Sequence, residues 1–229
     1  KGYVESNPDL DIQGLDSAHK ISILSSLAFK CKIVKFNEIF VEGISKIEKY
    51  DIEFAKQLNF VIKLLSVTKL KNDKLIRYVK PMMISKQSQL AQVNGVLNGI
   101  QITSKELGEI FFEGKGAGGT ATSNSIISDI LDITSKKTNK SLGIDYESLN
   151  SFNNSLIENE YASFYIRLMV YDKPGVLANI TLLLKNNDIS IETLIQNPQN
   201  KKIISDCIPL VFTTHKTYFK NITECIKKI

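Results

Sequence analysis

Five charged side chains near the start of the chain have types and spacings that suit acid–base chemistry. They are Glu5, Asp9, Asp11, Asp16 and Lys20. The apolar residues that follow recur every three to four positions and predict a helix that begins near Asp16. Asp16 and Lys20 then lie on one face of that helix, one turn apart, where their side chains meet. A solvated ion pair with no chemical role is the simplest interpretation, worth about 0.3–0.5 kcal/mol.

The surroundings of Lys20 favour a chemical role instead. Ala18, Ile21, Leu24 and Leu27 predict a buried stripe beside the lysine. Partial burial lowers the pKa of a lysine, whereas a neighbouring carboxylate opposes that shift and orients the ammonium group. An ammonium group held in this way can donate a proton to a reacting oxygen. Lys20 is therefore a candidate proton donor.

A glycine-rich segment offers a second site. Gly114, Gly116 and Gly119 satisfy the spacing G-x-G-x-x-G between a predicted strand and a predicted helix. A primary dinucleotide fingerprint also needs a second parallel strand that ends in an acidic residue about 20 positions on. Here a polar stretch follows the helix, which argues against that interpretation. A tight turn with no ligand is a further alternative.

The overall composition excludes several classes of protein. The net charge of +5 over 229 residues is spread along the chain, so we predict no nucleic-acid partner. No apolar run reaches the roughly 18 residues of a membrane span, so we expect no membrane partner. Cys31, Cys207 and Cys225 lack CxxC spacing. They predict free thiols in a reducing cytoplasm. We therefore expect no disulfide framework and no metal site.

The periodicities predict a mixed α/β (α+β) fold, in which a mixed sheet carries helices on one face and a ferredoxin-like domain follows. In the first 133 residues we expect helices from about 16, over 51–58 and up to about 133, and strands over 61–67, 75–83, 96–103 and 107–112. The apolar run of 61–67 suggests a strand covered on both faces. A hairpin turn is expected at Asn72-Asp73. Residues 134–160 are polar and predict a linker.

The last section, 161–229, predicts the order βαββα. Its strands are expected over 161–170, 189–195 and 203–212, and its helices over 176–187 and 218–228. A split βαβ ferredoxin-like unit would need one more strand at its end. The chain also begins without an initiator methionine, so we interpret it as a fragment of a longer protein.

The segment from Glu5 to Lys20 resembles the catalytic-domain signature of the homoserine dehydrogenase family, with Glu, Pro, Asp, Gly, Asp and Lys at the same spacings. The similarity continues through 21–29, 41–44, 94–96 and 114–129, so that 1–133 resembles the C-terminal part of that catalytic domain. Departures from the family pattern occur at Asn7, Lys30, Ala121 and Asn124.

The resemblance implies an oxidoreductase that interconverts L-homoserine and L-aspartate 4-semialdehyde with NAD or NADP, in threonine and methionine biosynthesis. It implies that Lys20 donates the proton, that Asp16 orients it, and that Glu5 and Asp11 bind the substrate. Gly116 would approach the nicotinamide end of the cofactor through its backbone. The nucleotide-binding domain would lie outside the chain, so the fragment alone is expected to be inactive.

Residues 165–178 resemble the opening of an ACT domain, a module that binds amino acids between paired copies. Asp172 and Gly175 are the candidate effector contacts, because free N–H groups at a helix N-terminus favour a carboxylate. Threonine is the implied effector and a homo-oligomer the implied assembly. An ordinary Asp-x-Pro-Gly turn stays open as an alternative. A stand-alone amino-acid-binding or oligomerisation module is the alternative for the whole chain, although such a module needs no acid–base set.

Overall fold

The computed structural model describes residues 8–116, 118–135, 145–196 and 207–229. Its contacts divide the chain into two compact units, which are described separately. The first unit comprises Lys1–Asp73 and Arg77–Asn153, and the second comprises Lys74–Ile76 and Asn154–Ile229. Glu5 lies outside the described residues.

The first unit is built on a sheet with the strand order β1-β3-β2. Its strands are β1 (Phe40–Val41), β2 (Phe60–Lys71) and β3 (Lys74–Ser85), and β1 runs parallel to β3. Asn72 and Asp73 join β2 to β3 with φ angles of 51° and 55°. Two left-handed residues in succession are typical of a type I′ hairpin turn. The hairpin predicted at this position is therefore confirmed.

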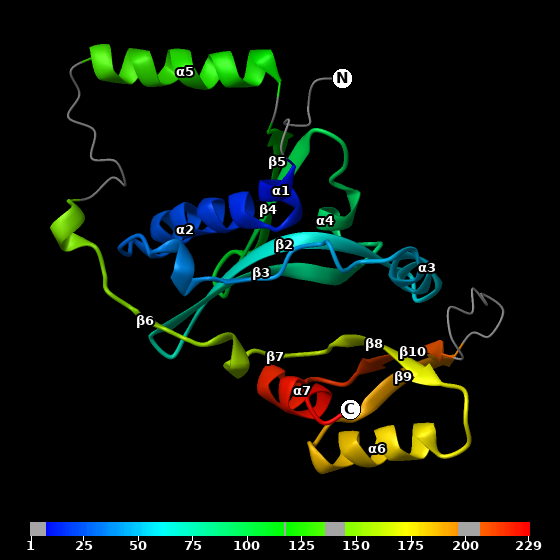
Figure 1. Cartoon of the computed structure of the whole chain (residues 1–229). Coiled ribbons are helices and arrows are strands. Elements are labelled where there is room, and N and C mark those ends of the chain that lie inside the picture. The colour runs from blue at the N-terminus through cyan, green and yellow to red at the C-terminus, as the bar shows by residue number, and fades with distance from the viewer. Residues whose placement is uncertain (1–7, 117, 136–144, 197–206) are drawn as a thin grey trace. The chain divides into compact units, whose positions relative to one another are not determined.

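Helices pack against this sheet. The long helix α2 (Leu15–Phe29) and the shorter α3 (Lys49–Gln57) both contact β2 (Figure 1). The core joins α2, β3 and the segment after the 3-10 helix η1 (Phe36–Glu38) through Ala18, Ile21, Ile39 and Val79. Both helices were expected from the sequence. A one-turn helix, α1 (Asp9–Ile12), precedes α2.

The strand β2 differs from its prediction. Its apolar run suggested a strand covered on both faces, but each residue from Phe60 to Thr68 is only half-buried. Apolar content indicates that a strand can be covered, whereas the degree of cover depends on which elements pack against it.

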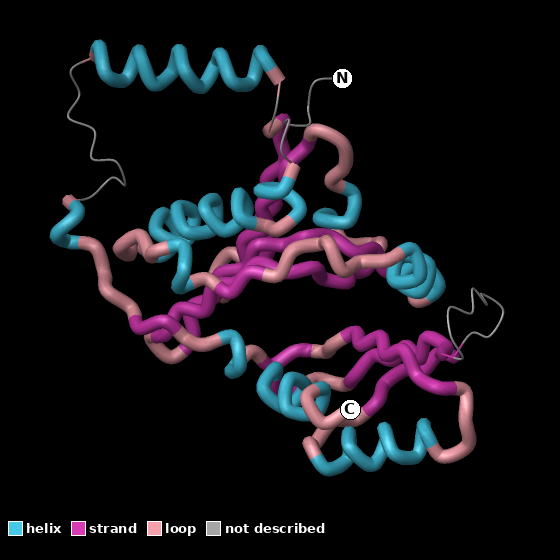
Figure 2. The backbone as a smooth tube through the Cα atoms, viewed as in Figure 1, coloured by secondary structure: helices cyan, strands magenta, loops and turns pink. Residues whose placement is uncertain are grey.

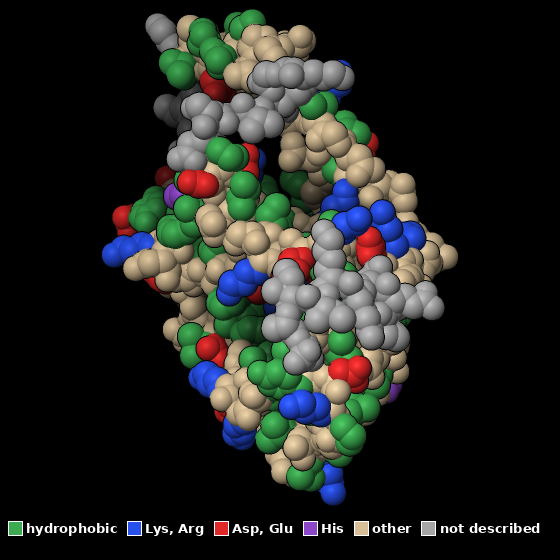
Figure 3. All heavy atoms as spheres, turned by 45° about the vertical axis from the view of Figure 1, so that its right-hand side comes forward, with side chains coloured by type: hydrophobic (Ala, Val, Ile, Leu, Met, Phe, Trp, Pro, Cys, Tyr) green, Lys and Arg blue, Asp and Glu red, His purple; other side chains and the backbone are tan. Residues whose placement is uncertain are grey.

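A separate two-stranded antiparallel sheet completes the first unit. The short helix α4 (Gln89–Gln92) leads into β4 (Leu97–Ser104), which pairs with β5 (Gly108–Lys115). The helix α5 (Gly119–Thr134) follows and buries none of its residues. Apolar side chains are visible on its surface at the top of Figure 3. More than half of the surface is exposed at Ile126, Ile127, Ile130, Leu131 and Ile133.

The second unit has the predicted βαββα order. Its main elements are β8 (Tyr165–Tyr171), α6 (Val176–Asn186), β9 (Ile191–Gln196), β10 (Cys207–Thr214) and α7 (Phe219–Ile226). The sheet order is β8-β10-β9, with both pairs antiparallel. Both helices share one hydrophobic core with the sheet and so cover the same face of it (Figure 2). That core includes Ile166, Leu184, Leu210, Phe212 and Ile222.

The strand boundaries depart from the expected ones in two places. The strand expected over 161–170 is split into β7 (Tyr161–Ala162), which pairs with β11 (Thr217–Tyr218), and β8. The strand expected over 203–212 is described only from Cys207, and 203–206 lie outside the described residues.

Part of the stretch predicted as a linker is packed. The 3-10 helices η2 (Tyr146–Ser148) and η3 (Ile157–Asn159) and the strand β6 (Asn153–Asn154) occur there, and β6 pairs with β3. Leu149 and Ile157 are buried. Sparse apolar residues can therefore anchor a polar segment, which average composition does not reveal.

Candidate active site

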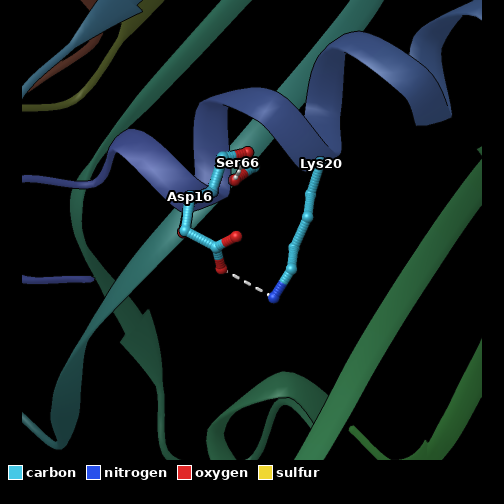
Figure 4. Close-up of polar contacts among 4 residues, drawn as sticks. Asp16, Lys20 and Ser66 are labelled. Carbon is cyan, nitrogen blue, oxygen red and sulfur yellow. Dashed lines mark hydrogen bonds and ion pairs between the residues drawn. The ribbon is translucent and has the colours of Figure 1, made fainter. Parts of the chain in front are cut away.

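The pair predicted from the spacing of two charged residues is present in α2. Lys20 Nζ lies 2.7 Å from Asp16 Oδ2 (Figure 4). The two side chains come from the first half of the helix and meet one turn apart, as i,i+4 geometry requires. A carboxylate at this distance restricts where the ammonium group can lie. The pairing of Asp16 with Lys20 is thus confirmed.

The predicted burial of Lys20 is wrong. Its side chain is 62% exposed and that of Asp16 is 43% exposed. At 100° per residue, both residues lie on the face of α2 opposite Ala18, together with Leu27, which is 49% exposed. The buried face contains Ser22, Ser25 and Ser26. The predicted stripe is confirmed at Ala18 and Ile21, which are buried, and is wrong at Leu27. Apolar periodicity also missed the buried serines, because serine does not count as apolar.

One contact holds the first turn of α2, which carries Asp16, and a second holds α1 just ahead of it. The Ser66 hydroxyl in β2 donates to the Ser17 carbonyl at 3.2 Å, next in sequence to Asp16 (Figure 4). Ahead of the helix, the Ile44 amide donates to the Ile12 carbonyl at 2.8 Å. A Cβ on Gly43 would collide with that same carbonyl, so only glycine permits this approach. Ser66 was not singled out from the sequence, where its only signal is a polar residue within an apolar strand.

Of the two predicted substrate-binding residues upstream of this pair, the structure describes one. Asp11 lies exposed in α1, and Gly14, with φ of 78°, connects that helix to α2. Glu5 lies outside the described residues, so its predicted role stays a prediction.

The glycine-rich segment connects an antiparallel strand to a helix. It leaves β5 at Lys115 and enters α5 at Gly119, and the partner of β5 is the antiparallel β4. A dinucleotide fingerprint belongs to a parallel βαβ unit. The interpretation as a primary fingerprint therefore does not fit this fold.

Within this segment, contacts with other residues of the chain explain why residue 116 is a glycine. The Gly116 amide donates to the Val96 carbonyl at 3.0 Å. The carboxamide of Asn98 fills the place that a Cβ at 116 would take. By contrast, an added Cβ at Gly114 or Gly118 would meet no described residue within 4 Å. Asn98 was not singled out from the sequence, which gives no local signal for it.

The second unit has a cavity of its own, at the predicted turn between β8 and α6. Its volume is about 340 Å³. The predicted effector contacts, Asp172 and Gly175, both line it, as does the first residue of α6, Val176. The Lys173 ammonium lies 5.4 Å from the centre of the Tyr171 ring. The remaining lining comes from Val170, Pro174, Leu177, Gln196 and Leu210.

Other features of the described ranges bear on the kind of site. The described residues contain no group of three or more His, Cys, Asp or Glu side chains placed to hold a metal ion. All three cysteines are free; Cys31 and Cys225 are buried, and Cys207 is half-buried. None of the helices in the described ranges combines the length and apolar character needed to cross a bilayer.

Fold and site together define an α/β protein with a helix-borne lysine–aspartate pair, a glycine-rich strand-to-helix connection and a βαββα unit. The family model of homoserine dehydrogenase matches residues 1–131. The homoserine dehydrogenase of Helicobacter pylori is 39% identical over 229 residues, which is 100% of this chain and 53% of the relative. That of Neisseria gonorrhoeae is 32% identical, over 100% of this chain and 53% of the relative. The chain belongs to the homoserine dehydrogenase family.

Solved structures agree with this membership. A homoserine dehydrogenase from Thiobacillus denitrificans superposes with a TM-score of 0.87 at 29% identity, over 100% of this chain and 52% of that protein. The S. aureus homoserine dehydrogenase at pH7.5 gives a TM-score of 0.68 at 27% identity, over 99% of this chain and 52% of that protein. The chain spans about half the length of the curated relatives it matches.

Proposed function

We propose that this chain supplies the substrate-binding and proton-transfer part of a homoserine dehydrogenase, which interconverts L-homoserine and L-aspartate 4-semialdehyde. The observation that carries the proposal is the 2.7 Å contact of Lys20 with Asp16, in a chain whose family model covers this pair. When bound, NAD or NADP exchanges a hydride with the substrate carbon. The nucleotide is held mainly by residues outside this chain, which spans about half of its relatives.

Lys20 handles the proton. During reduction of the aldehyde, negative charge develops on the carbonyl oxygen, and the Lys20 ammonium stabilises that charge and donates a proton to it. Asp16 holds the ammonium in place for this transfer. In the opposite direction, neutral Lys20 takes the proton from the homoserine hydroxyl. The 62% exposure of Lys20 lets it exchange protons with water between turnovers.

Carboxylates and glycines complete the proposed site. Glu5 and Asp11 bind the substrate ammonium, since a carboxylate is the natural partner of a primary amine. We assign the Gly116 backbone to the nicotinamide end of the cofactor, beside Gly114 and Gly118, where an added Cβ would meet no described residue within 4 Å. Without the rest of the enzyme, the chain has no appreciable activity.

Replacement of Lys20 in a full-length enzyme that carries this sequence tests the proposal. Lys20→Ala should lower turnover by about 100- to 10,000-fold, the usual contribution of general acid–base catalysis, with little change in cofactor affinity. The matched control is Lys49→Ala, which removes a similar exposed i,i+4 pair with Glu53 in α3. A parallel loss of turnover and of cofactor affinity would show that Lys20 is structural.

The cavity of the second unit favours a second function. We propose that it binds an amino acid, with threonine as the first candidate, as the resemblance to an ACT domain implies. Asp172 is suited to the ligand ammonium, and the N-terminus of α6 to the ligand carboxylate. The resemblance also implies that the protein works as a homo-oligomer. The free cysteines suit a reducing cytoplasm.

Calorimetry on the full chain tests this second function. Titration of L-threonine should release or absorb heat, and Asp172→Ala should weaken binding by about tenfold, the usual effect of losing one charged hydrogen bond. Glu192→Ala is the matched control, because Glu192 is exposed in β9 and does not line the cavity. The absence of heat at millimolar threonine would exclude threonine as the ligand.

A further inference from the structure

Lys63 is a cation inside an apolar strand. It lies in β2 with Ile62, Leu64 and Leu65 beside it, and it is half-buried. A half-buried ammonium group loses part of its contact with water, and oxygen acceptors replace what is lost. None of the roles described above uses this side chain.

The Lys63 ammonium finds two acceptors in one short segment. It donates to the Val93 carbonyl at 2.6 Å and to Asn94 Oδ1 at 3.0 Å. The other end of the Asn94 carboxamide donates to the Gln92 carbonyl at 2.9 Å, so the orientation of this amide is fixed from both sides. Lys63 therefore ties β2 to the connection between α4 and β4, about thirty positions further along the chain.

The segment that Lys63 holds leads directly to the glycine-rich segment. Beyond Asn94, the Val96 carbonyl accepts the hydrogen bond from the Gly116 amide. The Val93 side chain fills the place beside Gly99 in β4, in the same way that Asn98 fills the place beside Gly116. Displacement of Val93 would thus be passed to β4 and, through its pairing, to the end of β5.

The same strand also holds the other half of the site. Ser66, in β2, donates to the Ser17 carbonyl in the turn that carries Asp16. A single strand therefore contacts both the proton-transfer pair and the support of the glycine-rich segment.

We propose that Lys63 is a positioning residue, which fixes the β4–β5 hairpin and thereby the backbone of the glycine-rich segment that meets the cofactor. This inference rests on the proposed dehydrogenase function for its chemical meaning. The anchoring itself can be measured without any turnover.

The first experiment uses the full 229-residue chain. Lys63→Met keeps the length of the side chain and removes its donors, and amide hydrogen exchange then reports on the hairpin. Exchange at Leu97 and Gly116 should accelerate by about 10- to 100-fold, as expected for the loss of a charge-assisted hydrogen bond, while β8 to β10 stay unchanged. Lys63→Arg should restore most of the protection.

Lys71→Met, at the exposed end of β2, is the matched control. Unchanged exchange at Gly116 in a folded Lys63→Met variant overturns the proposal.

The second experiment uses a full-length enzyme that carries this sequence. Lys63→Met should raise the KM for the nicotinamide cofactor by about 10- to 100-fold, with a much smaller change in kcat, and Lys63→Arg should recover the KM. A lower stability with an unchanged KM would overturn the positioning role. If the unmodified enzyme has no dehydrogenase activity, the proposed function fails, and the exchange data still decide whether Lys63 anchors the hairpin.

Discussion

The two units bury polar side chains in different ways. The second unit has an apolar cluster that joins two helices to one face of a three-stranded sheet. It also buries Asn187, Thr214 and Thr217, each of which is hydrogen-bonded to a backbone group. The first unit buries a polar cluster that includes a charged group, formed by Ser22, Ser25, Ser26, Cys31 and Arg77. An apolar core is held by shape and area, whereas a polar cluster is held by directed hydrogen bonds.

The polar cluster links the end of α2 to β3. Arg77 Nε donates to Ser25 Oγ at 2.9 Å, and a terminal nitrogen of Arg77 donates to Cys31 Sγ at 3.4 Å. The Cys31 thiol in turn donates to the Ser25 carbonyl at 3.6 Å. These directed hydrogen bonds fix α2 at its far end, which suits a helix whose exposed face carries the proposed proton donor.

The largest effect is expected from the apolar core. Phe212→Ala in β10 should destabilise the second unit by about 3–5 kcal/mol, because it leaves a cavity among fully buried neighbours. Urea unfolding with hydrogen exchange at each amide measures this. Leu182→Ala, at a side chain that is 54% exposed, is the control and should cost less than about 0.5 kcal/mol. Equal destabilisation of the first unit would contradict a core that belongs to the second unit alone.

Removal of the buried guanidinium should have the next largest effect. Arg77→Met should cost the first unit about 1.5–3 kcal/mol, because Ser25 Oγ and Cys31 Sγ lose a charged donor in a buried place. The fall in the urea midpoint of the first unit measures it, with Lys49→Met as an exposed control. A variant as stable as the unmodified chain would show that shape alone holds α2.

A stabilising change is expected where α2 ends. Lys30 is the residue after the helix and has φ of 47° and ψ of 51°. A side chain in this left-handed conformation is strained, and glycine relieves the strain, so Lys30→Gly should stabilise the first unit by about 1 kcal/mol. Lys30→Ala, measured by the same urea titration, should give no such gain. Equal midpoints for both variants would exclude strain at this position.

The smallest effect should depend on pH and be confined to the second unit. Burial raises the pKa of the Cys225 thiol above 9.0, its ordinary value, although nearby Lys228 opposes the shift. The folded state therefore holds this proton more tightly than the unfolded state. The resulting stability is complete below pH 9.0 and is lost as the pH rises through the folded pKa. Cys225→Ala should flatten the alkaline fall in stability, whereas Cys207→Ala should leave it as it is. The same fall in both variants would assign the effect to another group.

Local patterns predicted much of the fold. The i,i+4 spacing of Asp16 and Lys20 predicted their contact, and Asn72-Asp73 predicted the hairpin turn. After residue 161, strand-like and helix-like periodicities follow one another and predicted the βαββα order. Each of these depends on residues only a few positions apart, whose relative geometry the backbone of a helix, turn or strand already restricts.

The amino-acid sequence by itself thus determined most of the longer helices and strands, the pairing of Asp16 with Lys20 and, through its motifs, the family. Only the tertiary structure decided that serines share the buried face of α2, that Asn98 lies against Gly116, and that Lys63 reaches Val93. The physical reason is the distance along the chain: these contacts join segments that only packing brings together. Ser25, on the buried face of α2, accepts a hydrogen bond from Arg77 of β3, a partner that the periodicity of the helix cannot reveal.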